Sequence, residues 1–167
     1  VAAAQSVDQM PLLTVYAIPG RDCGGYAAGG FATGEEYRQW IDQVANGIGD
    51  APVGIVLEPD ALSGADCLSA PQRQERAGLL SDAVLALTRN PNAAVYVDGG
   101  HSRWLTPAEL ASRLNAVGVQ SARGFSLNTS NFFSTAEEIA YGEQVSALLD
   151  GAHYVVDTSR NGAGPAP

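Results

Sequence analysis

Four apolar segments of this chain end at or near an aspartate. They read LLTVYAIPGRD, VGIVLEPD, NAAVYVD and AHYVVD, and they supply Asp22, Asp60, Asp98 and Asp157. A single aspartate at such a position is usually a helix cap or a turn former. Four of them on one edge would repel each other, and clustered carboxylates serve hard-metal binding, phosphoryl transfer on such a metal, or glycoside hydrolysis. The residue types alone leave these three chemistries open.

Two of these aspartates have contrasting neighbours. Arg21 directly precedes Asp22, and a nearby guanidinium favours the ionised form of a carboxyl group. Asp60 follows Pro59 and an apolar run, and burial favours the protonated form. We therefore expect Asp22 to stay ionised and Asp60 to be the carboxyl group that keeps its proton.

Aromatic, imidazole and amide side chains accompany these acids, namely Tyr16, His101, Trp104, Asn128 and Asn131. An aromatic face with hydrogen-bonding groups around it suits the apolar face and hydroxyl edge of a sugar ring. Each residue alone also has a structural explanation, since a tryptophan often belongs to the core and a histidine often completes a turn. The run HSRW directly after VDGG favours a binding role.

Parallel strands would bring the aspartates together. Strand-like apolar runs fall at 12–19, 53–58, 93–97, 123–127 and 153–156, and helical segments with caps and stops lie at 33–49, 69–91, 106–118 and 134–151. This alternation, with continuously apolar strands, predicts an α/β fold whose parallel sheet is covered on both faces. Ligands of such sheets bind at the carboxyl ends of the strands, so the four aspartates should share one rim.

The composition narrows the choice of partners. The 167 residues include 46% hydrophobic and 16% charged residues, which is typical of a globular chain, and the net charge is -9. This charge disfavours nucleic acid and anionic membranes as partners. No apolar run is long enough to cross a bilayer, and the first residues lack the features of a signal peptide. The run CGGYAAGG lacks the lysine of a phosphate loop, so we interpret it as a flexible loop.

The chain has two cysteines, Cys23 and Cys67. They are either separate buried thiols or one disulfide between the loops that follow the first two strands. Their positions after consecutive strands favour the disulfide, which would indicate an oxidising compartment.

Five motifs in order resemble a known family. VYAIPGRDC, VLEPDAL, VYVDGGHSRW, LNTSNF and VVDTSRNG resemble, over residues 12–165, the catalytic domain of glycoside hydrolase family 6, the cellulases that cleave β-1,4-glucans with inversion. The resemblance implies a distorted α/β barrel with fewer strands than the regular eightfold form. It also implies one catalytic domain over residues 1–167, β-1,4-glucan (cellulose or cello-oligosaccharides) as the partner, and neither a cofactor nor a metal.

The resemblance assigns catalytic roles to three residues. Asp60 matches the family's general acid, which protonates the leaving glycosidic oxygen. Asp22 matches the aspartate that sustains the raised pKa of this acid and helps to organise water. Tyr16 matches the tyrosine that distorts the sugar at the cleavage subsite. Cys23 and Cys67 match the family's first disulfide, which implies a secreted protein.

Candidate substrate-binding residues follow at the same rim. The resemblance places this role on the leaving-group side of the cleavage site, and we add three polar neighbours. The full set is Asp98, His101 and Trp104 from the family pattern, with Arg21, Asn128 and Asn131.

Two departures from the family pattern concern activity. Many relatives have a serine five or six residues after the aspartate of RDC that holds the nucleophilic water, and here Ala27 and Ala28 occupy those positions. Family domains also begin with a further strand and continue beyond DTSRNGAGP with subsites and the often-proposed base. We therefore expect a fragment of a longer domain, or a chain that pairs with another, with exposed sheet edges and apolar surface. A glucan-binding remnant without turnover is the alternative to an enzyme.

The mode of cleavage follows from one short loop. Only six residues separate Asp60 from Cys67, as in family members with open clefts. The resemblance therefore favours internal, endo-acting cleavage of the glucan.

Overall fold

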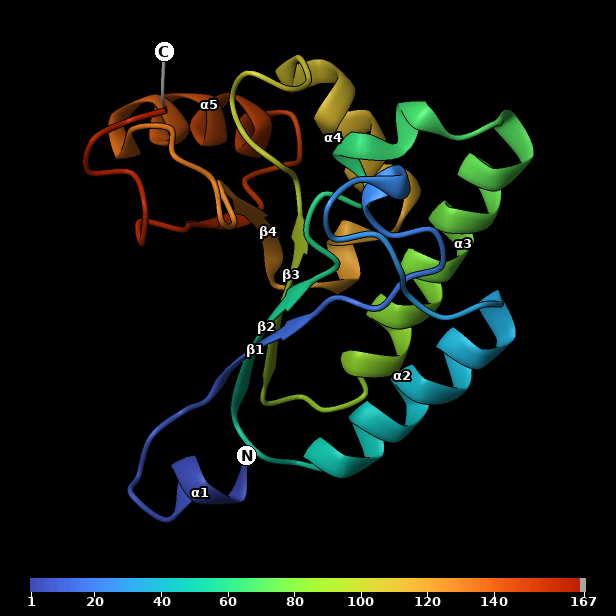
Figure 1. Ribbon diagram of the computed structural model, residues 1–167. Coiled ribbons are helices and arrows are strands. Elements are labelled where there is room, and N and C mark those ends of the chain that lie inside the picture. The colour runs from blue at the N-terminus through green and yellow to red at the C-terminus, as the bar shows by residue number, and fades with distance from the viewer. Residues whose placement is uncertain (166–167) are drawn as a thin grey trace.

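The computed structural model describes residues 1–165 and contains a five-stranded sheet (Figure 1). The strands are β1 Leu12–Val15, β2 Val53–Leu57, β3 Ala93–Asp98, β4 Gly124–Leu127 and β5 His153–Val156, in that order across the sheet. Every neighbouring pair is parallel, so the carboxyl ends of all five strands lie at the same edge. The predicted α/β fold with a parallel sheet is confirmed.

Helices connect the strands. They are α1 Ala2–Gln5, α2 Gly34–Ile48, α3 Ala70–Leu87, α4 Pro107–Ala116 and α5 Thr135–Ala147, with the short 3-10 helices η1 Asp22–Gly24, η2 Ser63–Cys67 and η3 Val119–Ser121. The predicted starts are confirmed, since the side chains of Thr33 and Ser134 accept hydrogen bonds from the backbone N–H groups of Glu36 and Glu137. Helix α1 was not predicted.

The first strand is shorter than predicted. We expected a strand over 12–19, but β1 ends at Val15. The backbone N–H groups of Ala17 and Ile18 donate hydrogen bonds to the side chain of Glu58 instead of continuing the ladder between β1 and β2. The chain from Tyr16 onward is therefore a loop that is held from the end of β2.

The core lies between one face of the sheet and helices α2 to α5. Ile55 and Leu57 of β2 are fully buried in it, and α2 contributes the equally buried ring of Tyr37. Helix α3 lies beside α2 (Figure 1) and presents the apolar face predicted from its sequence, including Leu79 and Leu87. Burial of each such side chain stabilises the fold by roughly 1.5–3 kcal/mol.

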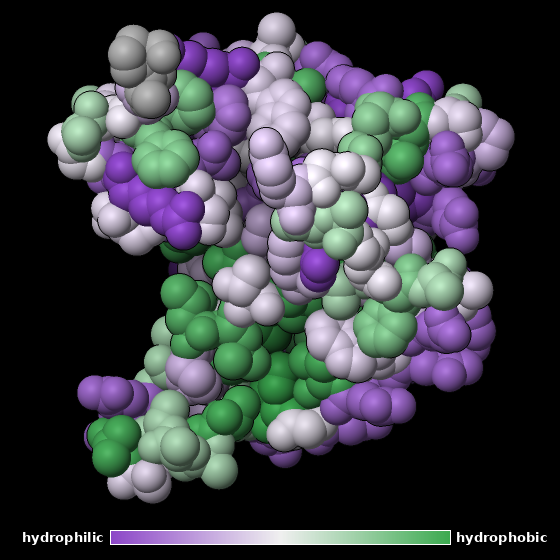
Figure 2. Space-filling model, in the orientation of Figure 1, coloured by the Kyte–Doolittle hydropathy of each residue, from purple (hydrophilic) through white to green (hydrophobic). Residues whose placement is uncertain are grey.

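The opposite face of the sheet is only partly covered, which corrects the expectation of cover on both faces. Leu12 and Met10 lie over Gly54 of β2, and they are 71% and 62% exposed. Val155 of β5 is also exposed. Figure 2 shows an apolar hollow over this part of the sheet. Strands β1 and β5 are its open edges, so the five strands do not close into a barrel within residues 1–165.

The helices of residues 1–165 are all too short or too polar to serve as a membrane span.

Candidate active site

A cavity of about 430 Å³ lies at the carboxyl ends of the strands. Its walls include Tyr16 and Asp22 from the loop after β1, Asp60 from the loop after β2, and Asp157 from the loop after β5. The loops after both edge strands therefore meet at one cavity, so the sheet is curved as a partial barrel requires. The predicted shared rim is confirmed for these aspartates. Within residues 1–165, no group of three or more His, Cys, Asp or Glu side chains is arranged to hold a metal ion.

Asp60 is the acid whose surroundings favour a proton. Its side-chain oxygen Oδ1 is buried and has no hydrogen-bond partner among the described residues. Burial, followed by the charges of Asp98 and Asp22, raises the pKa of Asp60 to about 6. A carboxyl group with this pKa keeps its proton in mildly acidic solution and can donate it to a bound group. This agrees with the expectation from the apolar run that precedes it.

The backbone at this rim is strained. Glu58 and Asp60, on either side of Pro59, have φ values of +52° and +66°. Such left-handed conformations cost on the order of 1–3 kcal/mol each in residues other than glycine. Of the eight non-glycine residues with positive φ in residues 1–165, six lie in the loops after β1, β2 and β4. Strain of this kind concentrates at functional sites, which marks these loops independently of their sequence.

Asp98 lies beneath Asp60 and is buried. Its Oδ1 accepts hydrogen bonds from the backbone N–H groups of Asp60 (3.0 Å) and Gly100 (2.9 Å). Its Oδ2 accepts hydrogen bonds from the hydroxyls of Ser126 (3.0 Å) and Thr129 (2.6 Å). Both oxygens accept hydrogen bonds and only 1% of the residue is exposed. In this structure Asp98 fixes the backbone of Asp60 and adds a nearby negative charge, and its predicted contact with substrate stays a prediction.

Residues 16–27, which we call the Asp22 loop, are held together by hydrogen bonds among their own polar groups. Asp22 Oδ2 accepts a hydrogen bond from the backbone N–H of Ala27 at 2.6 Å. Arg21 makes no ion pair with Asp22 among the described residues. Its guanidinium donates hydrogen bonds to the backbone carbonyls of Tyr16 and Ala27 and lies 4.5 Å from the Tyr16 ring centroid. Arg21 therefore supports the loop, and its predicted contact with substrate stays a prediction.

Tyr16 lies in the cavity with both acids. Burial, followed by the charges of Asp60 and Asp22, raises the pKa of the Tyr16 hydroxyl, so this group stays protonated at neutral pH. A neutral hydroxyl next to two carboxyl groups can donate a hydrogen bond within the cavity.

A disulfide joins Cys23 in η1 to Cys67 in η2. Of the two alternatives left open by the sequence, the disulfide is confirmed. It ties the loop that carries Asp22 to the segment that follows Asp60, so both acids stand on chain segments that are covalently linked.

Removing this disulfide should destabilise the protein. The bridge closes a loop with a sequence separation of 44 residues, for which the loss of loop-closure entropy in the unfolded chain corresponds to about 4 kcal/mol. We expect the double variant Cys23→Ala and Cys67→Ala to lose this amount in urea denaturation, measured against the oxidised wild type. A free energy of unfolding that changes by less than about 1 kcal/mol would show that the bridge does not constrain the fold as described.

Aromatic rings from the loops after β3 and β4 gather around His101. The ring of His101 lies 5.2 Å from Trp104 and 4.3 Å from Phe133, measured between centroids. Trp104 is 40% exposed and packs beside Gly64 in η2, next to the Asp60 segment. Burial lowers the pKa of His101, which favours the neutral imidazole. His101 and Trp104 do not line the cavity around Asp60, so any role in binding concerns a neighbouring surface.

The two predicted amide residues differ. Asn128 is buried: its amide N–H₂ donates hydrogen bonds to the backbone carbonyls of Phe133 and Asp157, and its amide oxygen accepts one from the backbone N–H of Phe133. The amide of Asn128 is therefore engaged with backbone groups in this structure, and its predicted contact with substrate stays a prediction. Asn131 is partly exposed and donates a hydrogen bond to the backbone carbonyl of Thr129, so its predicted role stays a prediction.

Several residues of the site were not predicted from the sequence. Tyr26, Thr129 and Ser130 line the cavity, and Thr14 of β1 projects from the strand into it. Thr129 and Ser130 directly follow Asn128 after β4, and only their position at a strand end could have indicated them.

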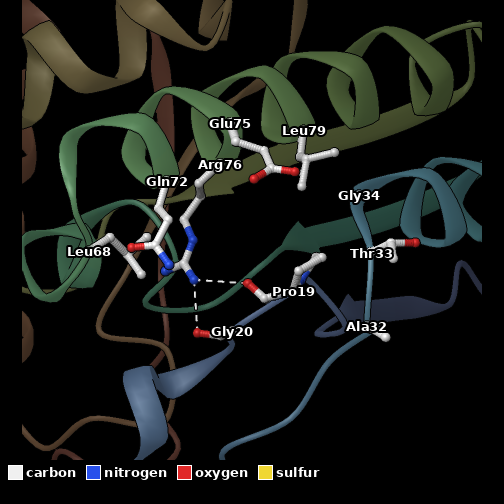
Figure 3. Close-up of a pocket in the computed structure, with 10 residues that line it drawn as sticks. All are labelled: Pro19, Gly20, Ala32, Thr33, Gly34, Leu68, Gln72, Glu75, Arg76 and Leu79. Atoms are coloured by element: carbon white, nitrogen blue, oxygen red, sulfur yellow. Dashed lines mark hydrogen bonds between the residues drawn. The ribbon is translucent and has the colours of Figure 1, made fainter.

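A second cavity, of about 400 Å³, lies between Pro19 and Gly20 after β1 and the first turns of α3 (Figure 3). Arg76 of α3 reaches into this region and donates hydrogen bonds to the backbone carbonyls of Pro19 and Gly20. The guanidinium of Arg76 thus stabilises the backbone after β1, and these donors are not free to bind a ligand in this cavity.

The fold and the rim define an α/β protein in which two carboxyl groups share one cavity, and one of them has a raised pKa. Glycoside hydrolysis uses this arrangement. The chain belongs to family 6 of the glycosyl hydrolases, because the sequence profile described as "Glycosyl hydrolases family 6" matches residues 1–167.

Individual relatives are similar to this chain over part of their length. Endoglucanase A of Cellulomonas fimi is 47% identical over 96% of this chain and 35% of the relative, and Endoglucanase 1 of Streptomyces halstedii is 43% identical over 97% of this chain and 53% of the relative. The chain thus spans about a third to a half of these proteins. A solved structure of the endoglucanase Cel6 from Mycobacterium tuberculosis, in complex with methyl-cellobiosyl-4-deoxy-4-thio-β-D-cellobioside, is 65% identical with a TM-score of 0.98, over 99% of this chain and 57% of that one.

Proposed function

We propose that this chain takes part in the hydrolysis of β-1,4-glucosidic bonds in cellulose with inversion of configuration, as the part of a catalytic domain that carries the acid. The observation that supports this most directly is Asp60: a carboxyl group with a buried, unpartnered oxygen and a pKa raised to about 6, in one cavity with Asp22 and Tyr16. The endoglucanase names of the relatives and the cello-oligosaccharide analogue in the similar structure agree with it.

The chemistry assigns one proton transfer to Asp60. Its carboxyl O–H donates the proton to the glycosidic oxygen as the bond from that oxygen to the anomeric carbon breaks. A water molecule forms the new bond to the anomeric carbon from the opposite face, which inverts the configuration, and it passes its extra proton to solvent. Solvent later returns a proton to the ionised Asp60, so the net reaction consumes one water molecule. In this proposal Asp22 stabilises the developing positive charge and orients this water. The role is supported by its position in the cavity and by its Oδ1, which accepts no hydrogen bond from the described residues.

Endo action and secretion are further parts of the proposal. The segment between Asp60 and Cys67 is short and contains the 3-10 helix η2, and none of its residues lines the cavity. The names of the two curated relatives agree with internal cleavage. The disulfide between Cys23 and Cys67 suits an oxidising compartment such as the extracellular space.

A glucan-binding function without turnover is the second candidate. It is favoured by one observation: Ala27 lines the cavity where a water-holding hydroxyl would help, and its methyl group cannot hold a water molecule.

One experiment separates the two candidates. We expect the chain to release reducing ends from carboxymethyl-cellulose and to produce the α-anomer first, as seen by proton NMR of the fresh product. Cello-oligosaccharide binding in calorimetry without any release of reducing ends would favour the binding function. Activity that disappears with EDTA and returns with a divalent cation would contradict a mechanism carried by carboxyl groups alone.

A further inference from the structure

The segment that runs from the end of β1 into η1 carries Tyr16 and Asp22 but has little regular structure to hold it. After Val15 the chain leaves the sheet, and the backbone N–H groups of Ala17 and Ile18 lose the strand partner that a continued β1 would give them. Buried backbone N–H groups that lack an acceptor cost free energy, so this loop needs acceptors from elsewhere in the fold.

Glu58 supplies these acceptors. Its Oε1 and Oε2 lie 3.0 and 3.1 Å from the backbone nitrogen of Ala17, and Oε2 lies 3.1 Å from that of Ile18. Only 1% of Glu58 is exposed, so water is not an alternative partner for its carboxylate. The backbone N–H of Glu58 also donates a hydrogen bond to the carbonyl of Val15 at 2.7 Å. The ends of β1 and β2 are therefore joined by both backbone and side-chain hydrogen bonds.

The strained turn places two acids in different surroundings. Glu58 and Asp60 are separated only by Pro59, and both have left-handed backbone conformations. The Glu58 side chain is directed to the loop after β1, whereas the Asp60 side chain lines the cavity. The same turn therefore supplies the proton donor and the anchor of the neighbouring loop.

A second side chain, that of Arg76, also holds the segment after β1. Arg76 donates hydrogen bonds to the carbonyls of Pro19 and Gly20 at 3.0 and 2.8 Å, so it holds the same loop from α3 (Figure 3). Burial lowers the pKa of the Arg76 guanidinium, and the negative charge of Glu58 opposes this fall. Burial raises the pKa of Glu58, while the N–H groups of Ala17 and Ile18, the Tyr37 hydroxyl and the Arg21 charge oppose this rise.

We propose that Glu58 is a positioning residue that binds the backbone N–H groups of Ala17 and Ile18 and thereby holds the Asp22 loop against Asp60. This role deepens the proposed function and rests on it, because it concerns how the proton donor is prepared. Glu58 does not itself touch the reacting atoms, since it is buried and lines no part of the cavity.

The consequence for Asp60 has a definite sign. The groups that face Asp60 are Asp22 and Tyr16 on the anchored loop and Asp98 on β3. Loosening the loop moves the Asp22 charge away and admits water to Asp60, and both changes favour the ionised form of Asp60. Loss of the anchor should therefore lower the pKa of Asp60.

Glu138 offers a matched comparison. It is equally buried, and its two side-chain oxygens lie 3.0 and 3.2 Å from the backbone nitrogen of Ser102, in the loop that carries His101 and Trp104. It thus anchors a different loop by the same kind of contact, and its charge does not reach Asp60.

The experiment compares the wild type with Glu58→Gln and Glu138→Gln by NMR. The pKa of the Asp60 carboxyl carbon is followed by titration, and amide hydrogen exchange is measured at Ala17, Ile18 and Ser102. In Glu58→Gln, we expect the pKa of Asp60 to fall by about one unit and the amides of Ala17 and Ile18 to exchange at least about tenfold faster. In Glu138→Gln, only the Ser102 amide should exchange faster.

Several results would overturn the proposal. The first is that Glu58→Gln changes neither the pKa of Asp60 nor the exchange rates of the Ala17 and Ile18 amides. The second is that Glu138→Gln lowers the pKa of Asp60 as much as Glu58→Gln does. If Glu58→Gln does not fold, Glu58→Asp keeps the charge but shortens the reach, and it should lower the Asp60 pKa in the same direction. These measurements do not require hydrolysis. If the protein releases no reducing ends, the proposed function is contradicted, but the role of Glu58 in holding the loop is still tested.

Discussion

Asparagine in place of Asp60 should lower kcat on carboxymethyl-cellulose by about 10²- to 10⁴-fold, which is the usual contribution of a positioned general acid. The amide has nearly the size of the carboxyl group, and the backbone N–H of residue 60 keeps its hydrogen bond to Asp98. The amide cannot transfer a proton to the glycosidic oxygen. A dinitrophenyl cellobioside, whose leaving group needs little protonation, should lose much less activity than the polymer.

The same variant should be at least as stable as the wild type at neutral pH. Because the pKa of Asp60 is raised in the folded state, the proton favours folding, and this stabilisation is lost as pH rises through about 6. Asparagine cannot ionise, so it avoids that loss, and the midpoint of thermal unfolding at pH 7 should not fall. Asp42→Asn is a matched control, since Asp42 only pairs with Arg89 at the surface. Equal activity of wild type and Asp60→Asn on the polymer would contradict the assignment.

Activity should fall steeply above pH 6. The acid must carry its proton before it can donate it, and with a pKa of about 6 its protonated fraction drops about tenfold for each further pH unit. At pH 8, kcat/KM should therefore be on the order of 100-fold below its plateau. The measurement is the pH dependence of initial rates on a soluble cello-oligosaccharide at concentrations below KM.

A control for unfolding belongs with this profile. Far-UV circular dichroism should be the same at pH 6 and pH 8, so that the loss reports ionisation alone. Rates that stay constant to pH 8 would mean that the group that donates the proton is not Asp60. A fall that begins near pH 4 would mean that the surroundings do not raise the pKa of Asp60 in solution.

Much of the fold was predictable because its signals are local. Apolar runs separated by capped helices indicate parallel strands, and the caps at Thr33, Thr106 and Ser134 lie where their sequences place them. The strand end at Val15 was not predictable in the same way. Residues 16–19 are as apolar as the strand before them, and what ends the strand is a side chain 40 residues later, Glu58, which takes the N–H group of Ile18.

The site was predictable in its location but not in the role of every residue. The rule for parallel sheets brought Asp22, Asp60 and Asp157 to one cavity, as expected. The roles of Asp98 and Asn128 depend on burial, and their polar atoms are used by neighbours distant in sequence. A residue type and its distance from a strand end do not reveal whether a carboxyl or amide group faces ligand or backbone.

The most direct test is the pKa of Asp60 in the wild type and in Asp22→Asn, measured by carbon NMR of the labelled carboxyl group. Asp22 shares the cavity with Asp60, and its charge is one of the causes that raise the pKa. We expect a value of about 6 in the wild type and a lower value in the variant. An Asp60 that titrates near its ordinary value of about 4 in both proteins would contradict the shared rim on which the proposed hydrolysis depends.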